Sequence, residues 1–281
     1  MSIELDVSEE QYRRLCDFLY RRTGMVFTES KRYFVERRVI DRMAAVGLVR
    51  FSDYFTHLRV NALDEIEHFV NSITVNETYF YREDYHFHCL TKDLLRRRIS
   101  ENPGAASLRI WAFPCSTGEE PYSLAMWLLE NWPPVDSYNV EIIGSDIDTK
   151  VLRAAREGMY GERALMRLTP DLIRKYFLQI EPQKWQIIPE LRESVQFSRV
   201  NVLDIAETQG QGKFDVIFCR NMLIYFDDAS RRRAAENLYE SLLPGGFICL
   251  GHTESMSRIS SLFEVCRFED AIVYQRAARK E

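Results

Sequence analysis

The sequence predicts an α/β protein with a small all-helical domain at its N-terminus and a short antiparallel β insertion. From about residue 108 onward, short apolar runs alternate with amphipathic segments of helix length, which is typical of the α/β class. The first 75 residues show only helical periodicity. The chain has 281 residues, 46% of them apolar and 28% charged, which suits one or two globular domains. We expect domains over residues 1–75 and 76–281, with the insertion at about 176–197.

Four helices are expected in the N-terminal domain. Ser8 and Gln11 have the spacing of a capping box, and the helix that they begin should end at Gly24. A second helix is expected over about 30–47. Shorter helices should follow near 52–58 and 62–73, the last with Asn61 as its cap.

The net charge of −5 conceals an uneven distribution. Residues 11–42 hold nine basic and four acidic side chains, so this stretch carries +5 and the remainder carries −10. Lys31, Arg38 and Arg42 should lie close together on the second helix, because offsets of seven and eleven residues are near whole turns. The stretch is either a module that docks an acidic partner or a well-solvated helical surface.

Six apolar runs in the α/β region are candidate strands, and three amphipathic stretches are candidate helices. The strands are expected over 108–113, 140–145, 195–200, 214–219, 247–251 and 271–275, and the helices over roughly 120–131, 149–157 and 229–242. Such apolar strands suit a parallel sheet that is buried on both faces, where ligands collect at the carboxyl ends. Residues 176–197 break the alternation, and Trp185–Pro189 and Ser194–Phe197 are expected to be inserted antiparallel strands.

The turn after the first candidate strand is the most informative segment. Ser116, Thr117 and Gly118 are small, which lets backbone approach a ligand closely. The turn lacks both glycine-rich phosphate-binding patterns. Glu119 stands at the start of the next helix, where a carboxylate is well placed to meet a cationic ammonium.

Two further strand ends carry polar side chains. Asp146 follows the second strand, where a carboxylate can accept both hydroxyls of a ribose; the alternative is that Asp146 or Asp148 only caps the next helix. Arg220 and Asn221 end a later strand, either as part of a site or as partners in loop hydrogen bonds. A ribose acid and a carboxylate for an ammonium, without a phosphate cradle, indicate S-adenosylmethionine as the cofactor.

Several segments, in this order along the chain, resemble the CheR-type chemotaxis receptor methyltransferases. They are Asn76–Arg82, Ser116–Ser123, Gly144–Asp148, Phe214–Phe226, Leu243–Gly246 and Gly251–Ser255. The resemblance implies a Rossmann-like S-adenosylmethionine-dependent methyltransferase sheet. It also implies a protein-glutamate O-methyltransferase that acts on the cytoplasmic helices of methyl-accepting chemoreceptors in signal adaptation. The products would be glutamyl methyl esters and S-adenosylhomocysteine.

The resemblance also implies the residues of the site and the docking surface. The positions that match cofactor-binding places are Asn76, Thr78, Arg82, Glu119, Asp146, Asn201, Val202, Arg220 and Asn221. Arg82 and Tyr225 match positions close to the transferred methyl group and are the candidate catalytic residues. With chemoreceptors as partners, the basic helix with Lys31, Arg38 and Arg42 becomes the surface that meets acidic methylation helices.

The chemistry of such a reaction needs little from the protein besides alignment. A glutamate carboxylate is already ionised at pH 7, so its attack on a sulfonium methyl requires no general base. Alignment and the exclusion of water are then the main sources of rate. We expect Arg82 to orient either the receptor carboxylate or the cofactor's own carboxylate. A single contact is expected, because a bidentate clamp on the attacking group would stabilise the ground state.

Two departures from the family pattern are visible. Phe113–Pro114 stands where relatives usually have small residues, so the turn beneath the cofactor is expected to be shaped differently. The insertion over 177–197 is short, and its turn at Pro182–Trp185 has no glycine. We therefore expect an enzyme that does not depend on a pentapeptide at the receptor's end.

Other functions find weaker support. His86 and His88 fall on different helix faces and lack further ligands for a metal. No histidine is evidently paired with Cys115 or Cys219 as a covalent nucleophile. The acidic total and the absence of an Asn/Asp-Pro-Pro-Tyr/Phe motif argue against nucleic-acid methylation. A non-catalytic S-adenosylmethionine-binding docking module in a signalling array remains the alternative to an enzyme.

The sequence favours a cytoplasmic protein without membrane insertion. It has no apolar run of about 18 residues, and its start lacks the pattern of a signal peptide. Six scattered cysteines without a Cys-x-x-Cys pair suit free thiols in a reducing compartment.

Overall fold

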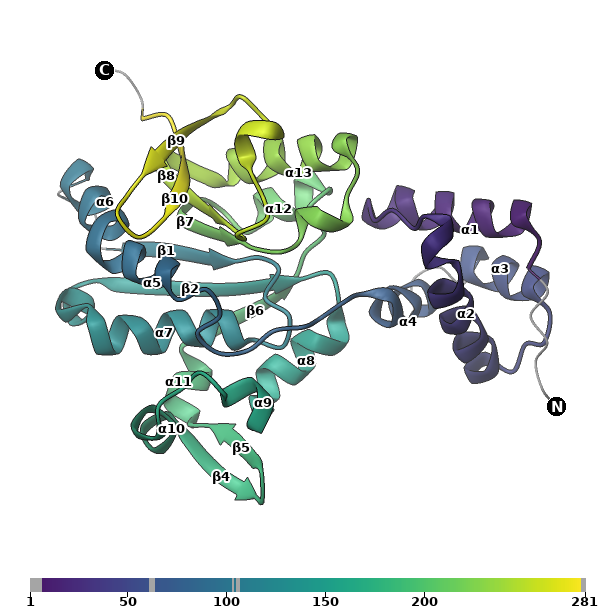
Figure 1. Cartoon of the computed structure of the whole chain (residues 1–281), viewed down its shortest axis with the longest axis horizontal. Helices are drawn as coiled ribbons and strands as arrows, with labels where there is room; N and C mark the ends of the chain where they lie inside the picture. Colours follow the sequence, from purple (N-terminus) through teal and green to yellow (C-terminus); the bar gives the residue numbers. More distant parts are fainter. Residues whose placement is uncertain (1–6, 61–63, 103, 105–106, 279–281) are drawn as a thin grey trace. The chain divides into compact units, whose positions relative to one another are not determined.

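A computed structural model describes residues 7–60, 64–102, 104 and 107–278. The chain forms two compact units (Figure 1). The first consists of residues 1–75 together with 225–230, and the second of residues 76–224 together with 231–281.

The first unit is helical. Its elements are α1 (Glu9–Thr23), the 3-10 turn η1 (Glu29–Lys31), α2 (Arg32–Val46), α3 (Phe51–Val60) and α4 (Asp64–Ile73). The capping box at the start of α1 is confirmed, because the side chains of Ser8 and Gln11 each accept the backbone N–H of the other. Gly24 ends the helix in the left-handed region, with φ at 72°. Asn61, the predicted cap of α4, lies outside the described residues.

A short segment from late in the sequence completes this unit. The hydroxyl of Tyr20 on α1 donates to both carboxylate oxygens of Asp227, at 3.0 and 3.3 Å. The backbone N–H of Val26 donates to the carbonyl of Tyr225 at 3.1 Å. Residues 225–230 are therefore tied to the helices of the first unit by specific hydrogen bonds.

A seven-stranded sheet organises the second unit. Its strands are β1 (Ser107–Ala112), β2 (Asn139–Asp146), β6 (Val195–Arg199), β7 (Phe214–Cys219), β8 (Leu242–Leu250), β9 (Phe263–Arg267) and β10 (Ile272–Arg276). The order across the sheet is β6-β2-β1-β7-β8-β10-β9. The first five strands are parallel and the last two are antiparallel. All six predicted strands are confirmed; β9, a mostly exposed edge strand, carried too weak a pattern to be predicted.

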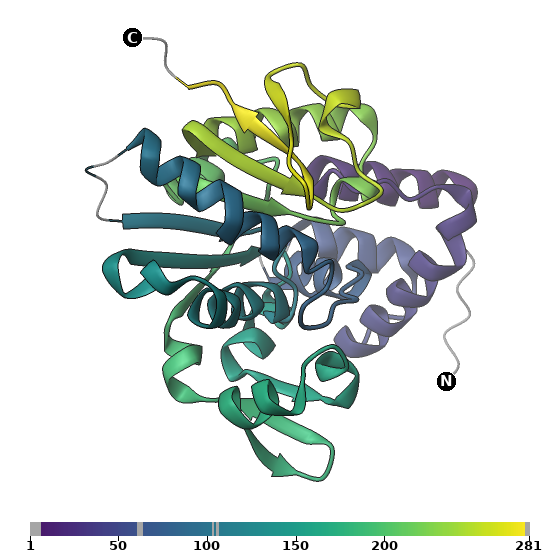
Figure 2. The same cartoon turned by 60° about the vertical axis from the view of Figure 1, so that its left-hand side comes forward.

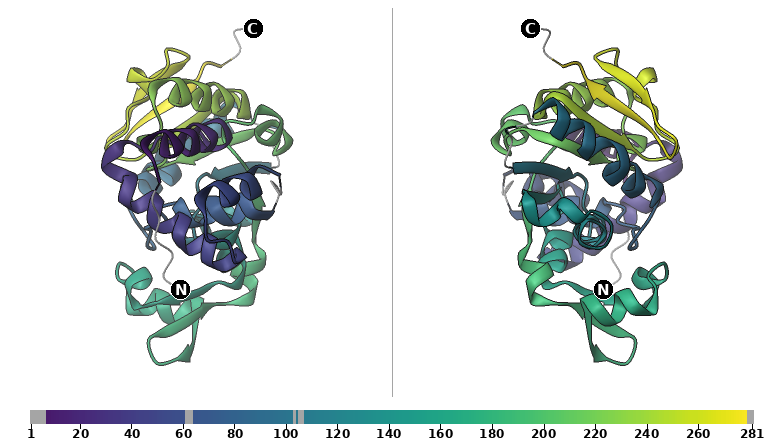
Figure 3. Two further views of the ribbon diagram at one scale, coloured as in Figure 1. Left: turned by 90° about the vertical axis from the view of Figure 1, so that its right-hand side faces the viewer. Right: turned by 90° about the vertical axis from the view of Figure 1, so that its left-hand side faces the viewer.

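Helices cover both faces of this sheet, as Figures 2 and 3 show. On one face lie α5 (Tyr85–Cys89), the π-helical turn η2 (Leu90–Leu94), α6 (Leu95–Glu101), α7 (Glu119–Asn131) and α8 (Thr149–Glu157), and on the other α12 (Ile205–Gly210) and α13 (Asp228–Ser241). Every residue of β7 is buried, as expected for a central strand between two helical layers. The predicted helices α7, α8 and α13 are confirmed.

The insertion forms a second sheet of three antiparallel strands in the order β3-β5-β4. Its elements are β3 (Met159–Gly161), α9 (Glu162–Leu165), α10 (Pro170–Tyr176), β4 (Phe177–Glu181), β5 (Lys184–Ile187) and α11 (Pro189–Glu193). The hairpin β4–β5 projects from the rest of the second unit in Figures 1 to 3. The prediction that Ser194–Phe197 is an inserted antiparallel strand was wrong. Val195 pairs with Ile142 in parallel, because β6 extends the main sheet and buries Val195 there.

Among the residues that the structure describes, no helix combines the length and apolar character needed to cross a bilayer.

Candidate cofactor site

The order of the strands along the main sheet reverses direction between β1 and β7. β1 pairs with β2 on one side and with β7 on the other. The connections after β1 and β7 therefore leave in opposite directions, which is the switch point where α/β proteins bind ligands. Most of the predicted cofactor residues follow the carboxyl ends of β1, β2, β6 and β7.

The turn between β1 and α7 is tightly constrained. Gly118 has φ at 94°, and a Cβ added there would lie 2.9 Å from Cβ of Ala155. A larger residue would both strain the backbone and push α8 away. The Phe113–Pro114 peptide bond in this turn is cis, and Ser116 adopts φ of 48°.

Asp146 lies at the centre of the site and connects its strands. Its carboxylate accepts the backbone N–H of Ser116 at 2.9 Å and that of Asp148 at 3.0 Å. Its carbonyl accepts the N–H of Val200, just after β6, at 3.0 Å. Burial raises the pKa of Asp146 to about 6, although the backbone hydrogen bonds act against this shift.

The residue that caps the helix after β2 is Asp148. Its side chain accepts the N–H groups of Lys150 and Val151 at the start of α8, at 2.8 and 3.1 Å. Asn76 Nδ2 donates to the other oxygen of Asp148 at 2.9 Å. Asp148 is thus the helix cap, and it holds Asn76 beside the turn, whereas Asp146 has no capping role.

Glu119 is the first residue of α7 and is 4% exposed. Thr117 Oγ1 donates to its carboxylate at 2.7 Å. Burial raises the pKa of Glu119 to about 7. No basic side chain of the described residues forms an ion pair with it. Within the described part of the chain, this buried acid therefore has no counter-ion.

The Arg220 side chain contacts other residues of the second unit. Its Nε lies 2.7 Å from Oε2 of Glu120, and its Nη2 donates to the carbonyl of Arg82 at 2.7 Å. Burial raises the pKa of Glu120 to about 7, while the guanidinium acts in the opposite direction. Sequence reasoning missed Glu120, because adjacent glutamates look equivalent although they point about 100° apart on a helix.

The two predicted catalytic residues fall in different units. Arg82 is half-buried, and its Nη1 donates to the carbonyl of Glu77 at 2.8 Å. Tyr225 belongs to the segment that completes the first unit, and it is 38% exposed. Arg82 thus belongs to the second unit and Tyr225 to the first.

The remaining predicted cofactor residues lie as follows. Thr78 is half-buried in the segment that leads from Asn76. Asn201 Oδ1 accepts the N–H of Leu203 at 3.1 Å, after β6. Val202 is buried, and its carbonyl accepts Nδ2 of Asn237 at 2.7 Å. Asn201 and Val202 therefore stabilise the loop that follows β6.

Glu254 is a structural residue of the site that sequence reasoning missed. Its carboxylate accepts backbone N–H groups from Asn221 and Leu223 at 2.8 Å and from Gly251 at 2.9 Å. Asn221 has φ at 58°, and a Cβ on Gly251 would lie 2.7 Å from its Oδ1. Glu254 thus holds together the loops after β7 and β8. The only signal was its place in the Gly251–Ser255 segment.

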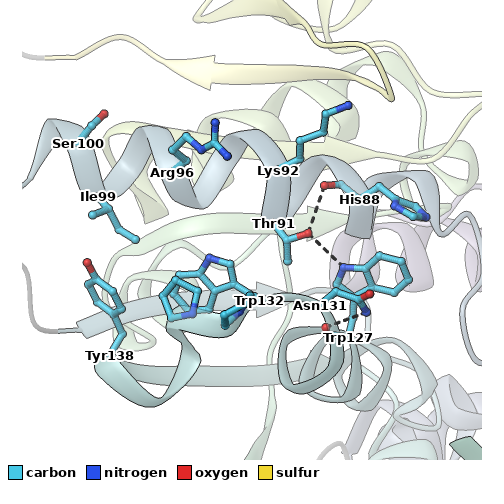
Figure 4. Close-up of a pocket in the computed structure, with 12 residues that line it drawn as sticks. His88, Thr91, Lys92, Arg96, Ile99, Ser100, Trp127, Asn131, Trp132 and Tyr138 are labelled. Atoms are coloured by element: carbon cyan, nitrogen blue, oxygen red, sulfur yellow. Dashed lines mark hydrogen bonds between the residues drawn. The ribbon is translucent and has the colours of Figure 1, made fainter.

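A separate groove lies at the far end of α7, between α5–α6 and the turn η3 (Pro133–Ser137), and is drawn in Figure 4. It encloses about 720 Å³, and Trp127, Trp132 and Tyr138 line it. Trp132 is 13 residues beyond Glu119, or about 20 Å at helical rise. None of the predicted cofactor residues lines this groove, so it is not the site described above.

The residues weighed for metal binding or covalent catalysis occupy other environments. Burial lowers the pKa of His86 to about 3, while His88 is exposed and packs edge-on against Trp127. Burial raises the pKa of the Cys115 and Cys219 thiols well above the usual value. Neither thiol is therefore a thiolate at neutral pH.

Comparisons with known proteins agree with this architecture. Residues 10–74 match the model of the CheR methyltransferase all-alpha domain, and residues 76–272 match that of the CheR methyltransferase SAM binding domain. The chain belongs to the CheR methyltransferase family. It is 44% identical to chemotaxis protein methyltransferase 2 of Vibrio cholerae over 97% of this chain and 95% of that one. It is also 36% identical to the chemotaxis protein methyltransferase of Escherichia coli, over 94% and 90%. The match to CheR proteins therefore spans both units.

Proposed function

We propose that this protein transfers a methyl group from S-adenosylmethionine to glutamate side chains of chemoreceptors, in signal adaptation. The observation that carries the proposal is the near-complete match to the CheR family, combined with two buried carboxylates at the switch point of the sheet. Asp146 would hold the ribose and Glu119 the ammonium of the cofactor.

The chemistry of the donor set fits such a cofactor. Asp146 accepts only backbone N–H groups, which leaves lone pairs for ribose hydroxyls. Glu119 is buried without a basic partner among the described residues, so a cationic ammonium would favour its ionised form. The turn at Gly118 supplies the close backbone approach that a bulky residue would prevent. When bound, the cofactor supplies an activated methyl group.

The protein's own part would be to align the carboxylate and to exclude water. The receptor glutamate is ionised at neutral pH and needs no base. Arg82 would orient it through one contact, and Tyr225 would lie near the methyl group. Arg220 is a positioning residue, because it donates to the carbonyl of Arg82 and is itself fixed by Glu120. Alignment of this kind is worth several kcal/mol in rate.

The experiment is incubation of the purified protein with receptor-rich membranes and cofactor that carries a radioactive methyl group. Base-labile label on receptors is the expected result, because glutamyl methyl esters hydrolyse in base. Cofactor binding without receptor label would instead support a non-catalytic docking module. Label that survives base would contradict ester formation.

We further propose that α2 and the residue that caps its start dock the receptor, mainly through Arg38 on α2 and Lys31 at the cap position. Lys31 is exposed, and Arg38 is 41% exposed with only a 3.8 Å ion pair to Asp41. Arg42 differs, because its guanidinium binds the buried carboxylate of Glu65 at 2.6 and 3.0 Å. Arg42 therefore contributes to the fold of the first unit, and its availability to a partner is reduced.

The double variant Lys31→Glu/Arg38→Glu tests this docking role. Receptor methylation should fall about tenfold, because like charges then face an acidic partner. Affinity for S-adenosylhomocysteine should stay unchanged. Arg37→Glu, on a neighbouring face of α2, is the control for charge alone. Equal losses of methylation and cofactor affinity would discredit the docking role.

We also propose that methylation does not require a pentapeptide at the receptor's end. The turn between β4 and β5 is short, with Gln183 at φ of 60° and no glycine. Methylation of a receptor with and without its C-terminal pentapeptide should proceed at equal rates. A loss of rate on truncation would contradict the proposal and would direct attention to the exposed edge strand β4.

A further inference from the structure

A groove between α1 and α3 has no role in the proposed reaction. It encloses about 510 Å³ and lies entirely within the first unit. Four arginines line it together with two phenylalanines and a single acid. These residues are Arg14, Arg21, Arg22, Arg59, Phe18, Phe55 and Asp17. We call it the α1–α3 groove.

Three of the four arginine side chains lie over the phenylalanine rings of the groove. The guanidinium of Arg14 lies 5.7 Å from the ring centroid of Phe55, and that of Arg59 lies 5.9 Å from the same centroid. Arg22 lies 5.4 Å from the ring of Phe18. Cation–π contacts restrain these side chains without neutralising them. The groove therefore presents several positive charges in restricted positions.

Most of this charge is uncompensated. Arg14, Arg21 and Arg59 are exposed, and none of them forms an ion pair with a described residue. Other arginines of this unit, the half-buried Arg32 and the exposed Arg50, do have carboxylate partners at 2.8 to 3.0 Å. Like charges that converge without partners repel each other, so an anionic ligand gains from their proximity.

The dimensions of the groove indicate the kind of ligand. Arg14 and Arg22 are eight residues apart, or about 12 Å along the axis of α1. One small anion such as phosphate cannot reach both, whereas carboxylates at i, i+4 and i+7 of a helix span about 10 Å. Phe18, half-buried among the arginines, supplies an apolar contact between the charges. A long nucleic acid fits less well, because the rest of the chain carries −10.

We propose that the α1–α3 groove binds an acidic helical segment of a partner protein. This surface is separate from the α2 surface with Lys31 and Arg38, since none of its lining residues lies on α2. The contact between Tyr20 and Asp227 also leaves it open, because Tyr20 lies about 100° or more around α1 from Arg14, Phe18 and Arg21. The proposal does not depend on methyl transfer.

Fluorescence anisotropy with a defined probe tests the proposal. The probe is a labelled helical peptide of about 18 residues, with glutamates at i, i+4 and i+7 and one leucine between them. A peptide with glutamines in their place is its control. The full-length protein should bind the acidic peptide and not the glutamine peptide. Affinity should fall as salt increases.

Matched variants then locate the binding. Arg14→Glu/Arg21→Glu should weaken binding at least about tenfold. Arg13→Glu/Arg37→Glu changes the charge equally but lies outside the groove, and it should retain binding. Arg14→Gln/Arg21→Gln, which preserves helix propensity, should also lose binding and guards against misfolding of the first variant. Thermal unfolding and cofactor affinity should match the wild type.

Three results would overturn the proposal. The first is equal weakening in the control variant, which would indicate general electrostatic attraction. The second is displacement of the peptide by inorganic phosphate at constant ionic strength, which would indicate a small-anion pocket. The third is tighter binding of a short DNA duplex than of the peptide.

Discussion

The candidate cofactor site and the α1–α3 groove both hold charged groups that form no ion pair with a described residue, but the two regions differ in burial. These groups are Glu119 in the first region and Arg14, Arg21 and Arg59 in the second. Glu119 and Asp146 are each 4% exposed, and burial raises the pKa of both. The arginines of the groove are exposed at the surface of the helical unit. One region therefore keeps its charge away from water, and the other keeps it in water.

The difference explains what each region can recognise. A buried carboxylate is costly to ionise, so it discriminates strongly for a ligand that supplies the matching cation or hydroxyls at a fixed position. Exposed guanidinium groups are solvated and screened by salt, so they bind their partners with lower affinity and lower specificity. The cofactor site is suited to one small molecule, and the groove to a surface with several charges.

The largest expected effect tests how burial changes the energetic contribution of a charge. The variant removes the ion-pair partner of a buried carboxylate. Arg42→Ala removes the ion-pair partner of Glu65, whose side chain is 5% exposed, while the hydroxyl of Tyr54 can still donate to it. Breaking a buried pair costs about 3 kcal/mol, so the free energy of unfolding should fall by that amount in urea titration. Arg37→Ala, which removes an exposed 3.5 Å pair with Asp41, should cost about 0.5 kcal/mol or less. Similar losses for both variants would contradict the role of burial.

Next in size is the removal of the central acid. Asp146→Ala should weaken S-adenosylhomocysteine binding about a hundredfold in isothermal titration, because a buried charged acceptor is lost. Asp171→Ala removes a carboxylate that is 83% exposed and should leave affinity unchanged. Undiminished binding by Asp146→Ala would refute the placement of the ribose.

The pH dependence of cofactor affinity is a smaller effect. Because burial raises the pKa of Glu119 to about 7 in the free protein, its carboxyl is largely neutral at pH 6. A ligand ammonium favours the ionised form, so affinity should rise up to about tenfold from pH 6 to pH 8. In the free protein the same shift means that stability falls as pH rises from the usual carboxyl pKa to about 7. Glu119→Gln should flatten both profiles, and an unchanged profile would exclude Glu119 as the ammonium partner.

The smallest effect concerns a residue that positions others. Glu254→Gln puts an amide NH₂ group where the carboxylate now accepts backbone N–H groups, so the loop with Asn221 should shift. We expect kcat/KM to fall about fivefold, mostly through KM for the cofactor. Glu264→Gln on the exposed face of β9 is the control. If both variants behave alike, Glu254 has no positioning role.

The sequence predicted the main sheet and the strand ends that carry the candidate site residues, because these follow from local apolar runs and turn residues. The segment from Tyr85 to Glu101 was not predicted to be helical. The π-helical turn at Leu90–Leu94 interrupts the 3.6-residue spacing on which such a prediction depends. The insertion was placed too late, because β3 has only three residues and pairs with β5 across 22 intervening residues.

The details of the site were less accessible than its location. Asp146 and Asp148 were equally good caps by sequence, and only the hydrogen bonds to Lys150 and Val151 distinguish them. Likewise, nothing local distinguishes Glu119 from Glu120. Their different roles arise from Arg220, which lies 100 residues later in the chain. Contacts of this kind between distant residues leave no periodic signal.

The six residues from Tyr225 to Ser230 have a consequence for engineering. They belong with the helices of the first unit, although they are encoded in the second half of the chain. A chimera that exchanges residues 1–75 alone between two family members would combine the helices of one protein with the 225–230 segment of the other. The hydrogen bond between Tyr20 and Asp227 would then form only if both proteins have these residues. Recombination should therefore move the two stretches together.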